Sequence, residues 1–161
     1  LVGIVEFAAF NQKSSLVVTA SNDNTARIWD TRTGSLLHTL KGHTKTVNSA
    51  AFDQEGSLVV TASNDNTARI WDSRTGSLLY TLKSHSDVVN SAYFSYDGKL
   101  LVTSSWDNTA KIWDMKTMSV TKTLYEIPGL YIKGVNFKDI SPRSKITDKQ
   151  KEIFRQNGAI I

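Results

Sequence analysis

The sequence predicts an all-β fold in which three four-stranded antiparallel sheets form an open arc of a larger ring, followed by a short α-helical C-terminal tail. Three observations lead to this prediction. One segment occurs three times along the chain. Each copy contains short runs of β-branched and aromatic residues separated by turn residues. No helical pattern of roughly 10–15 residues interrupts the series, which argues against parallel strands joined by crossover helices.

The repeat is the strongest structural signal in the sequence. Residues 15–41 and 57–83 are identical except at two positions, Thr31 against Ser73 and His38 against Tyr80. A more divergent third copy follows, and the tryptophans of the three copies are 42 residues apart, at Trp29, Trp71 and Trp113. This period lies in the range of a four-stranded β-propeller blade. We place the blades at about 1–41, 42–83 and 84–125.

Within each copy the pattern indicates four short strands. In the second copy they are expected at Thr46–Phe52, Leu58–Ala62, Thr67–Trp71 and Leu78–Leu82. Turn-forming residues occupy positions 54–56, 64–66 and 74–76 between them. Gly76 can take a positive φ, whereas the third copy has Met118 at that position, and the first has Ser14 where the second has Gly56. A non-glycine residue at a positive φ costs on the order of 1 kcal/mol.

A sheet of this sequence is apolar on both faces. In the third strand of the second copy, Ala68 and Ile70 point one way while Thr67, Arg69 and Trp71 point the other. One sheet cannot keep both faces from water, but sheets stacked face to face can. Because apolar burial contributes ~25 cal/mol per Å², each stacking interface should stabilise the fold by many kcal/mol.

Composition narrows the function classes. The chain has 161 residues and no cysteine, which excludes disulfides and cysteine-ligated metals and suits a reducing compartment. Residues 1–125 carry 12 Lys/Arg and 11 Asp/Glu, while residues 126–161 carry 7 and 4, so the basic charge lies mainly in the tail. No apolar stretch approaches the ~18 residues of a membrane span, and no signal peptide is visible. We expect a cytoplasmic protein. The absence of an initiator methionine suggests a fragment.

The repeat pattern stops after Tyr125. Residues 130–134 and 135–139 are in phase as two five-residue units, which predicts either two turns of a coil or one irregular strand. Thr147 and Gln150 are spaced as a capping box, which predicts a helix from Asp148 to about Asn157. We expect residues 126–161 to form a tail with a short coil and a helix.

The residues quoted above resemble the WD-repeat family. In the second copy the resemblance runs from Gly42-His43 through Val47 and Phe52 to the Trp71-Asp72 pair, and it covers about residues 2–125. It implies a β-propeller, usually a ring of seven blades. Three blades cannot close a ring. The remaining blades are therefore expected upstream in the same chain, or from another chain.

The resemblance also implies a structural hydrogen-bond network in each blade. An indole donates a hydrogen bond, a hydroxyl or an imidazole can both donate and accept, and a carboxylate accepts. These residue types therefore suit a hydrogen-bond network. The second blade would use Trp71, Thr61, His43 and Asp65. The third would use Trp113, Thr103, His85 and Asp107. The first has Thr19, Asp23 and Trp29 but no histidine at the matching place, a second sign of truncation.

These trios could be mistaken for catalytic triads. The same trio recurs in successive blades, which suits a repeated structural clamp, and no nucleophile elbow or metal-ligand cluster appears. We therefore expect no enzyme activity, no cofactor and no metal. His38 has Tyr80 as its counterpart and is expected to be a surface residue.

By resemblance, one face of the propeller binds proteins or peptides. The positions that match its usual contact points are Ile4, Glu6, Asn22, Thr46, Asn48, Asn64, Val88, Asn90 and Trp106. Trp106 differs most from its siblings, because Asn22 and Asn64 occupy the same turn position. An exposed tryptophan on a rigid loop suits a binding hot spot. Alternatively, its ring folds against a neighbouring blade.

We therefore expect a protein–protein interaction scaffold with protein or peptide partners, no small-molecule substrate and no membrane contact. Two alternatives remain. The basic tail could make the chain a nucleic-acid-binding accessory module, although the nearly neutral blades argue against it. The propeller could also be a sensor or regulatory unit attached to an upstream signalling NTPase or kinase.

Overall fold

The computed structural model describes residues 3–125, and this part of the chain consists of strands and turns. The all-β prediction is thereby confirmed. No helix in this range is long and apolar enough to cross a membrane. The coil and helix expected between residues 126 and 161 lie outside the described residues.

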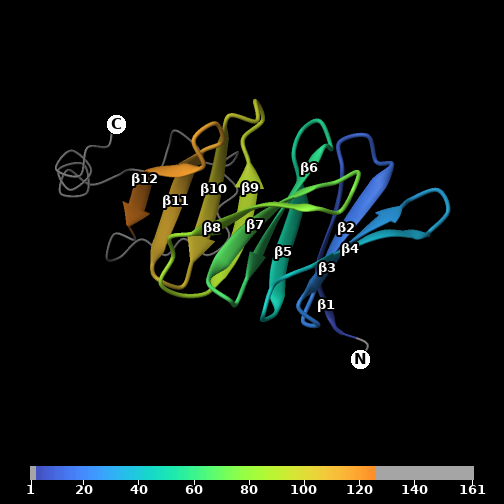
Figure 1. Cartoon of the computed structure of the whole chain (residues 1–161), viewed down its shortest axis with the longest axis horizontal. Helices are drawn as coiled ribbons and strands as arrows, with labels where there is room; N and C mark the ends of the chain where they lie inside the picture. Colours follow the sequence, from blue (N-terminus) through green and yellow to red (C-terminus); the bar gives the residue numbers. More distant parts are fainter. Residues whose placement is uncertain (1–2, 126–161) are drawn as a thin grey trace, which may run out of the picture. The chain divides into compact units, whose positions relative to one another are not determined.

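Twelve strands form three separate four-stranded antiparallel sheets, as predicted (Figure 1). The first sheet contains β1 (Val5–Phe10), β2 (Leu16–Ser21), β3 (Thr25–Asp30) and β4 (Leu36–Lys41). The second contains β5 (Val47–Phe52), β6 (Leu58–Ser63), β7 (Thr67–Asp72) and β8 (Leu78–Lys83). The third contains β9 (Val89–Phe94), β10 (Leu100–Ser105), β11 (Thr109–Asp114) and β12 (Ser119–Tyr125). The expected bounds in the second sheet differ from these by one residue at one end of each strand.

The turns follow the residues that were singled out for them. Gly56 and Gly76 take φ values of +73° and +72°. Where glycine is replaced, the backbone keeps the same conformation, with φ of +55° at Ser14 and +54° at Met118. The turn geometry therefore belongs to the repeat, and these two side chains are held in the left-handed region.

Each sheet has two chemically distinct faces. We call the face that carries Trp29, Trp71 or Trp113 the Trp face, and the opposite face, which carries Ile28, Ile70 or Ile112, the Ile face. A bulge between Val47 and Ser49 shifts the alternation along β5. As a result Val47 and Ala50 lie on the Trp face, whereas Ala51 lies on the Ile face.

The sheets stack with the Ile face of one against the Trp face of the next. The first interface buries Val18, Ile28 and Leu40 of the first sheet against Val47, Val59 and Trp71 of the second. At the second interface the matching residues, Val60, Ile70 and Leu82, pack on Val89, Leu101 and Trp113. Most of these side chains are fully buried. The core of this unit is therefore made between sheets, because no sheet buries its apolar residues alone.

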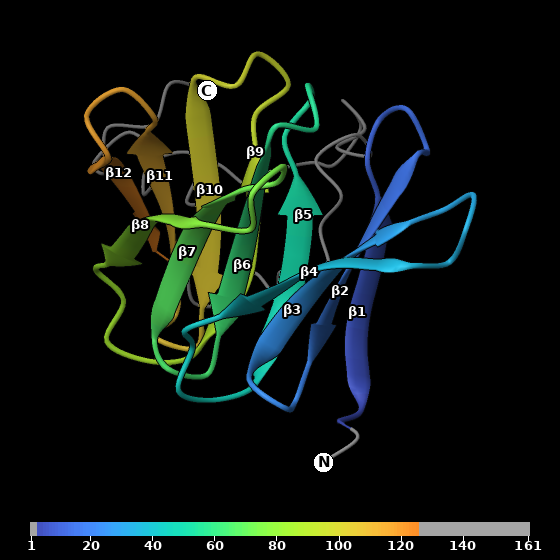
Figure 2. The same ribbon diagram turned by 45° about the vertical axis from the view of Figure 1, so that its right-hand side comes forward.

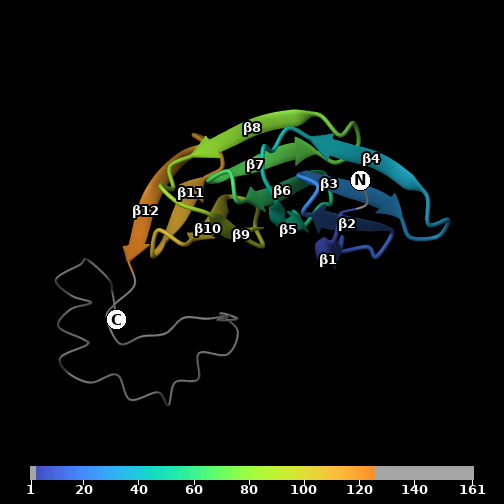
Figure 3. The same ribbon diagram turned by 90° about the horizontal axis from the view of Figure 1, so that it is seen from below.

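The inner strands carry the contact between sheets. β5 contacts β1, β2 and β3, and β9 contacts β5, β6 and β7. Figure 3 shows β1, β5 and β9 on one side of the stack and β4, β8 and β12 on the other, and Figure 2 shows the outer strands from a second direction. The turns that end β2, β6 and β10 consequently lie along one edge of the stack, and this edge carries the candidate contact residues.

Candidate functional site

A continuous chain of hydrogen bonds runs through the second sheet. Trp71 Nε1 donates to Thr61 Oγ1 at 2.9 Å. Thr61 Oγ1 lies 2.8 Å from His43 Nε2, and His43 Nδ1 lies 2.8 Å from Asp65 Oδ2. Indole can only donate and carboxylate only accept, so the histidine donates from Nδ1, and the Nε2 atom of a neutral ring accepts from the threonine hydroxyl. This direction requires a neutral imidazole.

The ionisation of the network agrees with that direction. Burial lowers the pKa of His43 below 6.5, against the opposing effect of the Asp65 carboxylate. Burial alone would raise the pKa of Asp65, but hydrogen bonds from Thr67, His43 and Thr44 hold it at about 2. A neutral histidine and a charged aspartate therefore coexist, and the donors around Asp65 compensate for its partial burial.

The third sheet repeats the same connections. Trp113 donates to Thr103 at 3.0 Å, and His85 lies 2.7 Å from both Thr103 and Asp107. Hydrogen bonds, led by that from Thr109, hold the pKa of Asp107 at about 2 although burial acts to raise it.

The first sheet completes its network differently. Trp29 donates to Thr19 at 2.9 Å as in the other sheets. Asp23, however, accepts a hydrogen bond from Arg27 at 2.6 Å in place of a histidine. In the second sheet Asp65 bonds His43, and the matching Arg69 lies instead over Gly42 and Trp71. The aspartate is partnered in every sheet, but by different side chains.

This geometry supports a structural role for the network. The Thr61 hydroxyl is buried, and the histidine ring packs against Trp71 with ring centroids 6.3 Å apart. A catalytic base needs access to substrate, which these buried atoms lack. Between residues 3 and 125, no group of three or more acidic or histidine side chains is placed to hold a metal ion.

The candidate contact residues fall into three repeated groups along one edge of the stack. In each group a backbone N–H on the turn after the second strand donates to a carbonyl oxygen just before the first strand. The three donor–acceptor pairs are Asn22 to Ile4, Asn64 to Thr46 and Trp106 to Val88. The structure therefore brings the predicted positions together in pairs within each sheet.

The candidate contact residues of the three sheets differ in how far their side chains are exposed to solvent. Trp106 is 64% exposed and Ile4 is 66% exposed, so among residues 3–125 no neighbouring sheet covers the tryptophan. Glu6, Asn22 and Asn90 are also exposed. Thr46 and Val88 are half-buried. The third sheet thus presents the largest exposed aromatic surface of the edge, with Asn90 and Val88 beside it in the fold.

Three of the candidates already use their side chains inside the fold. Asn22 Oδ1 accepts from the Ile4 N–H at 2.7 Å. Asn48 Nδ2 donates to Asn64 Oδ1 at 2.7 Å and to the carbonyl oxygen of Val89 at 3.0 Å. The second of these bonds crosses from one sheet to the next. Asn48 and Asn64 are half-buried as a result. In the third sheet Trp106 replaces the asparagine, so Asn90 has no equivalent partner there.

Two further residues contribute to this edge and were not among the predicted contact positions, although Asn66 was predicted to lie in a turn. Asn24 and Asn66 take positive φ values of +70° and +68° in the turns after the second strands. Their side-chain amides donate to the carbonyl oxygens of Thr44 and Ser86 in the following sheet. The signal was available, because asparagine recurs at this position in all three copies, including Asn108.

His38, expected at the surface, is partly covered. His38 is half-buried, and a Cβ at Gly76 would lie 3.1 Å from the Cβ of His38. The outer strand of the first sheet therefore touches the last turn of the second. Its counterpart Tyr80 is 47% exposed, which explains why the residue type varies between the copies.

Comparison with known proteins accounts for this arrangement. The sequence model of the family described as "WD domain, G-beta repeat" matches residues 3–30, 34–72 and 76–114. The chain belongs to the WD40 repeat family. The first match covers β1 to β3, and the second and third each cover the outer strand of one sheet and the first three strands of the next. The WD40 tryptophan and aspartate of the second match are Trp71 and Asp72.

Among curated proteins, a 39-residue stretch of this WD40 chain is 51% identical to "Dynein assembly factor with WD repeat domains 1" of Danio rerio and 49% identical to that of Xenopus laevis. The stretch is 24% of this chain and 9% of each relative. The solved "Structure of U3-55K" superposes with a TM-score of 0.73 at 22% identity, over 77% of this chain and 40% of that one. This structural likeness shows the shared WD40 fold.

Proposed function

We propose that the chain is a protein-interaction scaffold, and that the surface around Trp106 is its main contact point. WD40 repeats typically serve as non-catalytic interaction modules, and the name of the matched dynein assembly factor agrees with a role in building protein complexes. The observation that carries the proposal is an indole that is 64% exposed where the sibling sheets have asparagine.

The position of Trp106 suits a contact residue. Its backbone N–H is fixed to the carbonyl oxygen of Val88 at 2.9 Å, so the turn is anchored. A rigid backbone reduces the entropy lost when the ring is covered by a partner. Val88 and Asn90 add an apolar and an amide side chain beside it, which suits an extended peptide with one apolar anchor and nearby polar groups.

Charge does not favour nucleic acid as the ligand of these sheets. The three sheets lie within residues 1–125, which carry 12 basic and 11 acidic residues. Nucleic-acid binding depends on a basic surface that releases counterions from phosphates. A peptide or protein surface is therefore the class of partner that we propose.

The test is selection of a displayed random-peptide library on the chain. Selected peptides are then measured against Trp106→Asn, which installs the residue of the other two sheets and so preserves the turn. Loss of one indole hot spot corresponds to about 2 kcal/mol, so the Kd should rise at least tenfold. The matched control is Tyr96→Ala, because Tyr96 is 82% exposed in the turn between β9 and β10, at the opposite end of the third sheet. Equal binding to W106N and wild type would refute the proposal, as would failure to select any peptide.

A further inference from the structure

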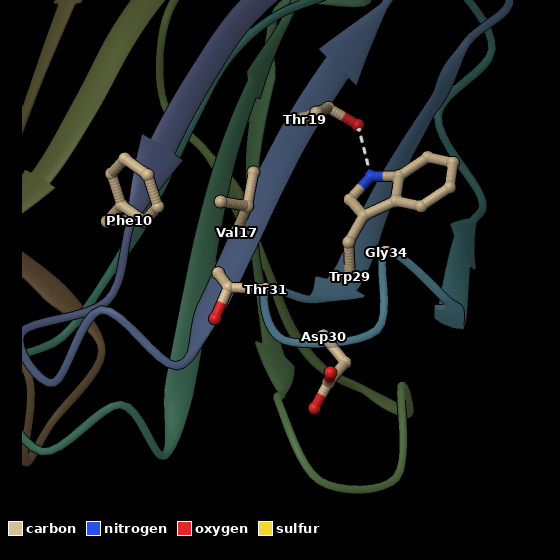
Figure 4. A pocket seen from close by; sticks show the side chains of 7 residues that line it. All are labelled: Phe10, Val17, Thr19, Trp29, Asp30, Thr31 and Gly34. Atoms are coloured by element: carbon tan, nitrogen blue, oxygen red, sulfur yellow. Dashed lines mark hydrogen bonds between the residues drawn. The ribbon is translucent and has the colours of Figure 1, made fainter.

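Each end of the stack presents an apolar face that nothing covers among residues 3–125. At one end is the Trp face of the first sheet, where Phe10 is 65% and Val5 is 59% exposed. A shallow pocket on this face is shown in Figure 4, with the Trp29 indole bonded to Thr19 at its side. The pocket is lined by Phe10, Val17, Thr19, Trp29, Asp30, Thr31 and Gly34.

At the other end is the Ile face of the third sheet. Leu100 is 40%, Tyr93 43% and Leu124 43% exposed on this face. Leu40 and Leu82 occupy the position of Leu124 in the first and second sheets, and there they are 0% and 4% exposed. The lower exposed fraction of these two leucines shows how much of such a side chain a neighbouring sheet covers.

The two open faces are the same two surfaces that pack together twice inside the chain. On the Trp face the first sheet carries Val5, Ala8, Phe10, Val17 and Trp29. The second sheet carries Val47, Ala50, Phe52, Val59 and Trp71 at the same positions. The residue type is identical at all of them. The uncovered Trp face therefore has every side chain that holds an Ile face at the interface between the first two sheets.

We infer that two copies of this chain associate head to tail, with the Ile face of the third sheet of one molecule packed on the Trp face of the first sheet of the other. This inference does not depend on the proposed function. Five residues of the third sheet are identical to those at the same positions of the first. They are Leu100, Val102, Ala110, Ile112 and Leu124, which match Leu16, Val18, Ala26, Ile28 and Leu40.

The outer strand of one sheet also touches the last turn of the next sheet. Inside the chain, His38 lies against Gly76. The equivalent pair between two molecules is Lys122 of one and Gly34 of the other. No heavy atom lies within 4 Å of a Cβ placed at Gly34, so the site is open. Asp30 lines the same pocket, so the ammonium group of Lys122 would find a carboxylate there.

Besides Lys122, two residues on the Ile face of the third sheet differ from their counterparts in the other two sheets. Ser104 replaces an alanine, but its hydroxyl is paired with that of Ser91 at 2.7 Å and leaves no unsatisfied group. Tyr93 replaces Ala51, which is 7% exposed and lies towards the margin of its interface. The larger ring must be accommodated at that margin, so Tyr93→Ala is expected to strengthen the association.

The contact joins two different faces and is therefore heterologous. Each added copy leaves one open Trp face and one open Ile face, unless the copies close into a ring. The association is consequently expected to grow with concentration, and blocking either face should stop it.

Disulfide trapping tests the proposed register directly, because the chain contains no cysteine. Gly34→Cys and Lys122→Cys are prepared as two proteins and mixed under mild oxidation. Head-to-tail packing predicts that the mixed disulfide dominates over both homodimers. The internal control is the double variant His38→Cys with Gly76→Cys. Its Cβ separation of 3.1 Å is shorter than the ~3.5–4.5 Å of disulfides, so a small outward shift of the exposed turn should let it close within one chain.

Sedimentation velocity of the whole chain supplies the second readout. The wild type is expected to sediment faster as its concentration rises from about 1 μM to about 100 μM, a range that detects micromolar Kd values. Phe10→Asp changes a side chain that is already exposed, so the monomer should fold but remain monomeric. Tyr93→Ala should shift the association to lower concentration. A wild type that stays monomeric throughout, or a statistical mixture of disulfides in the trapping experiment, would overturn the inference.

Discussion

Asn48 of β5 donates a hydrogen bond to the carbonyl oxygen of Val89 at the start of β9, and so ties the second sheet to the third. The same amide group also bonds Asn64 on its own sheet. A residue expected to contact partners is thus used in part to hold two sheets together.

Asn48→Ala is expected to lower the free energy of unfolding by about 1 kcal/mol, since the carbonyl of buried Val89 and the side-chain oxygen of half-buried Asn64 both lose their donor. Urea unfolding followed by tryptophan fluorescence measures this change. Asn90→Ala removes the equivalent side chain of the third sheet, which is exposed, and should leave the midpoint unchanged. Equal effects of the two substitutions would show that the bond between sheets does not contribute.

Thr61→Val is expected to destabilise the chain by ~1–3 kcal/mol. The substitution keeps the volume but leaves the Trp71 indole N–H and the His43 imidazole without their buried partner. Thr19→Val is the matched control, because Thr19 bonds Trp29 in a sheet that lacks the histidine. The control should show a smaller loss in thermal unfolding. Identical melting of Thr61→Val and the parent would contradict the network as described.

The stability of the chain is expected to fall as the solution is acidified below pH 6.5. Burial lowers the pKa of His43, so the unfolded chain takes up a proton near pH 6.5 that the folded chain refuses. Asp65 adds a second loss between its ordinary pKa of 3.8 and about 2, because its carboxylate is stabilised in the folded state. Both groups act in the same direction.

Urea unfolding from about pH 7.5 to about pH 5 isolates the histidine contribution. His43→Gln cannot titrate, so it should be less stable than the wild type at the upper pH but lose less stability across the range. If the two proteins show the same dependence on pH, the proton uptake comes from other groups.

Ser14→Gly is expected to raise the free energy of unfolding by about 1 kcal/mol. Ser14 is exposed at a φ of +55°, where a Cβ is unfavourable. The reciprocal change, Gly98→Ser at a φ of +67°, should lower it by a similar amount, since no heavy atom lies within 4 Å to add contact. Differential scanning calorimetry of both variants tests the pair. Shifts of the same sign would rule out backbone strain as the cause.

Sheets, turns and the indole–hydroxyl–imidazole chain could be predicted because they depend on residue types at fixed spacing. Contacts between sheets were harder to foresee, because they depend on which atoms meet across an interface. His38 looks like a surface residue until its contact with Gly76 is known. Asn48 similarly fits a partner-contact residue in the sequence, and only the structure shows that it bonds the carbonyl oxygen of Val89.

A further relationship becomes visible only in three dimensions. A side chain at Gly42 would meet the guanidinium group of Arg69 and the Trp71 ring. In the third copy serine occupies the glycine position, at Ser84, and the arginine is replaced by Lys111. Lys111 lacks the guanidinium group, and its Nζ lies 3.5 Å from Thr123 Oγ1. The glycine and the arginine are thus replaced together in the third copy.

Because one face of each sheet matches the opposite face of its neighbour, a tandem copy of the 42-residue unit brings its own complementary surfaces with it. Growth by duplication therefore needs no compensating change in the units on either side. The near-identity of residues 15–41 and 57–83 is what such an insertion leaves behind before drift begins to separate the copies.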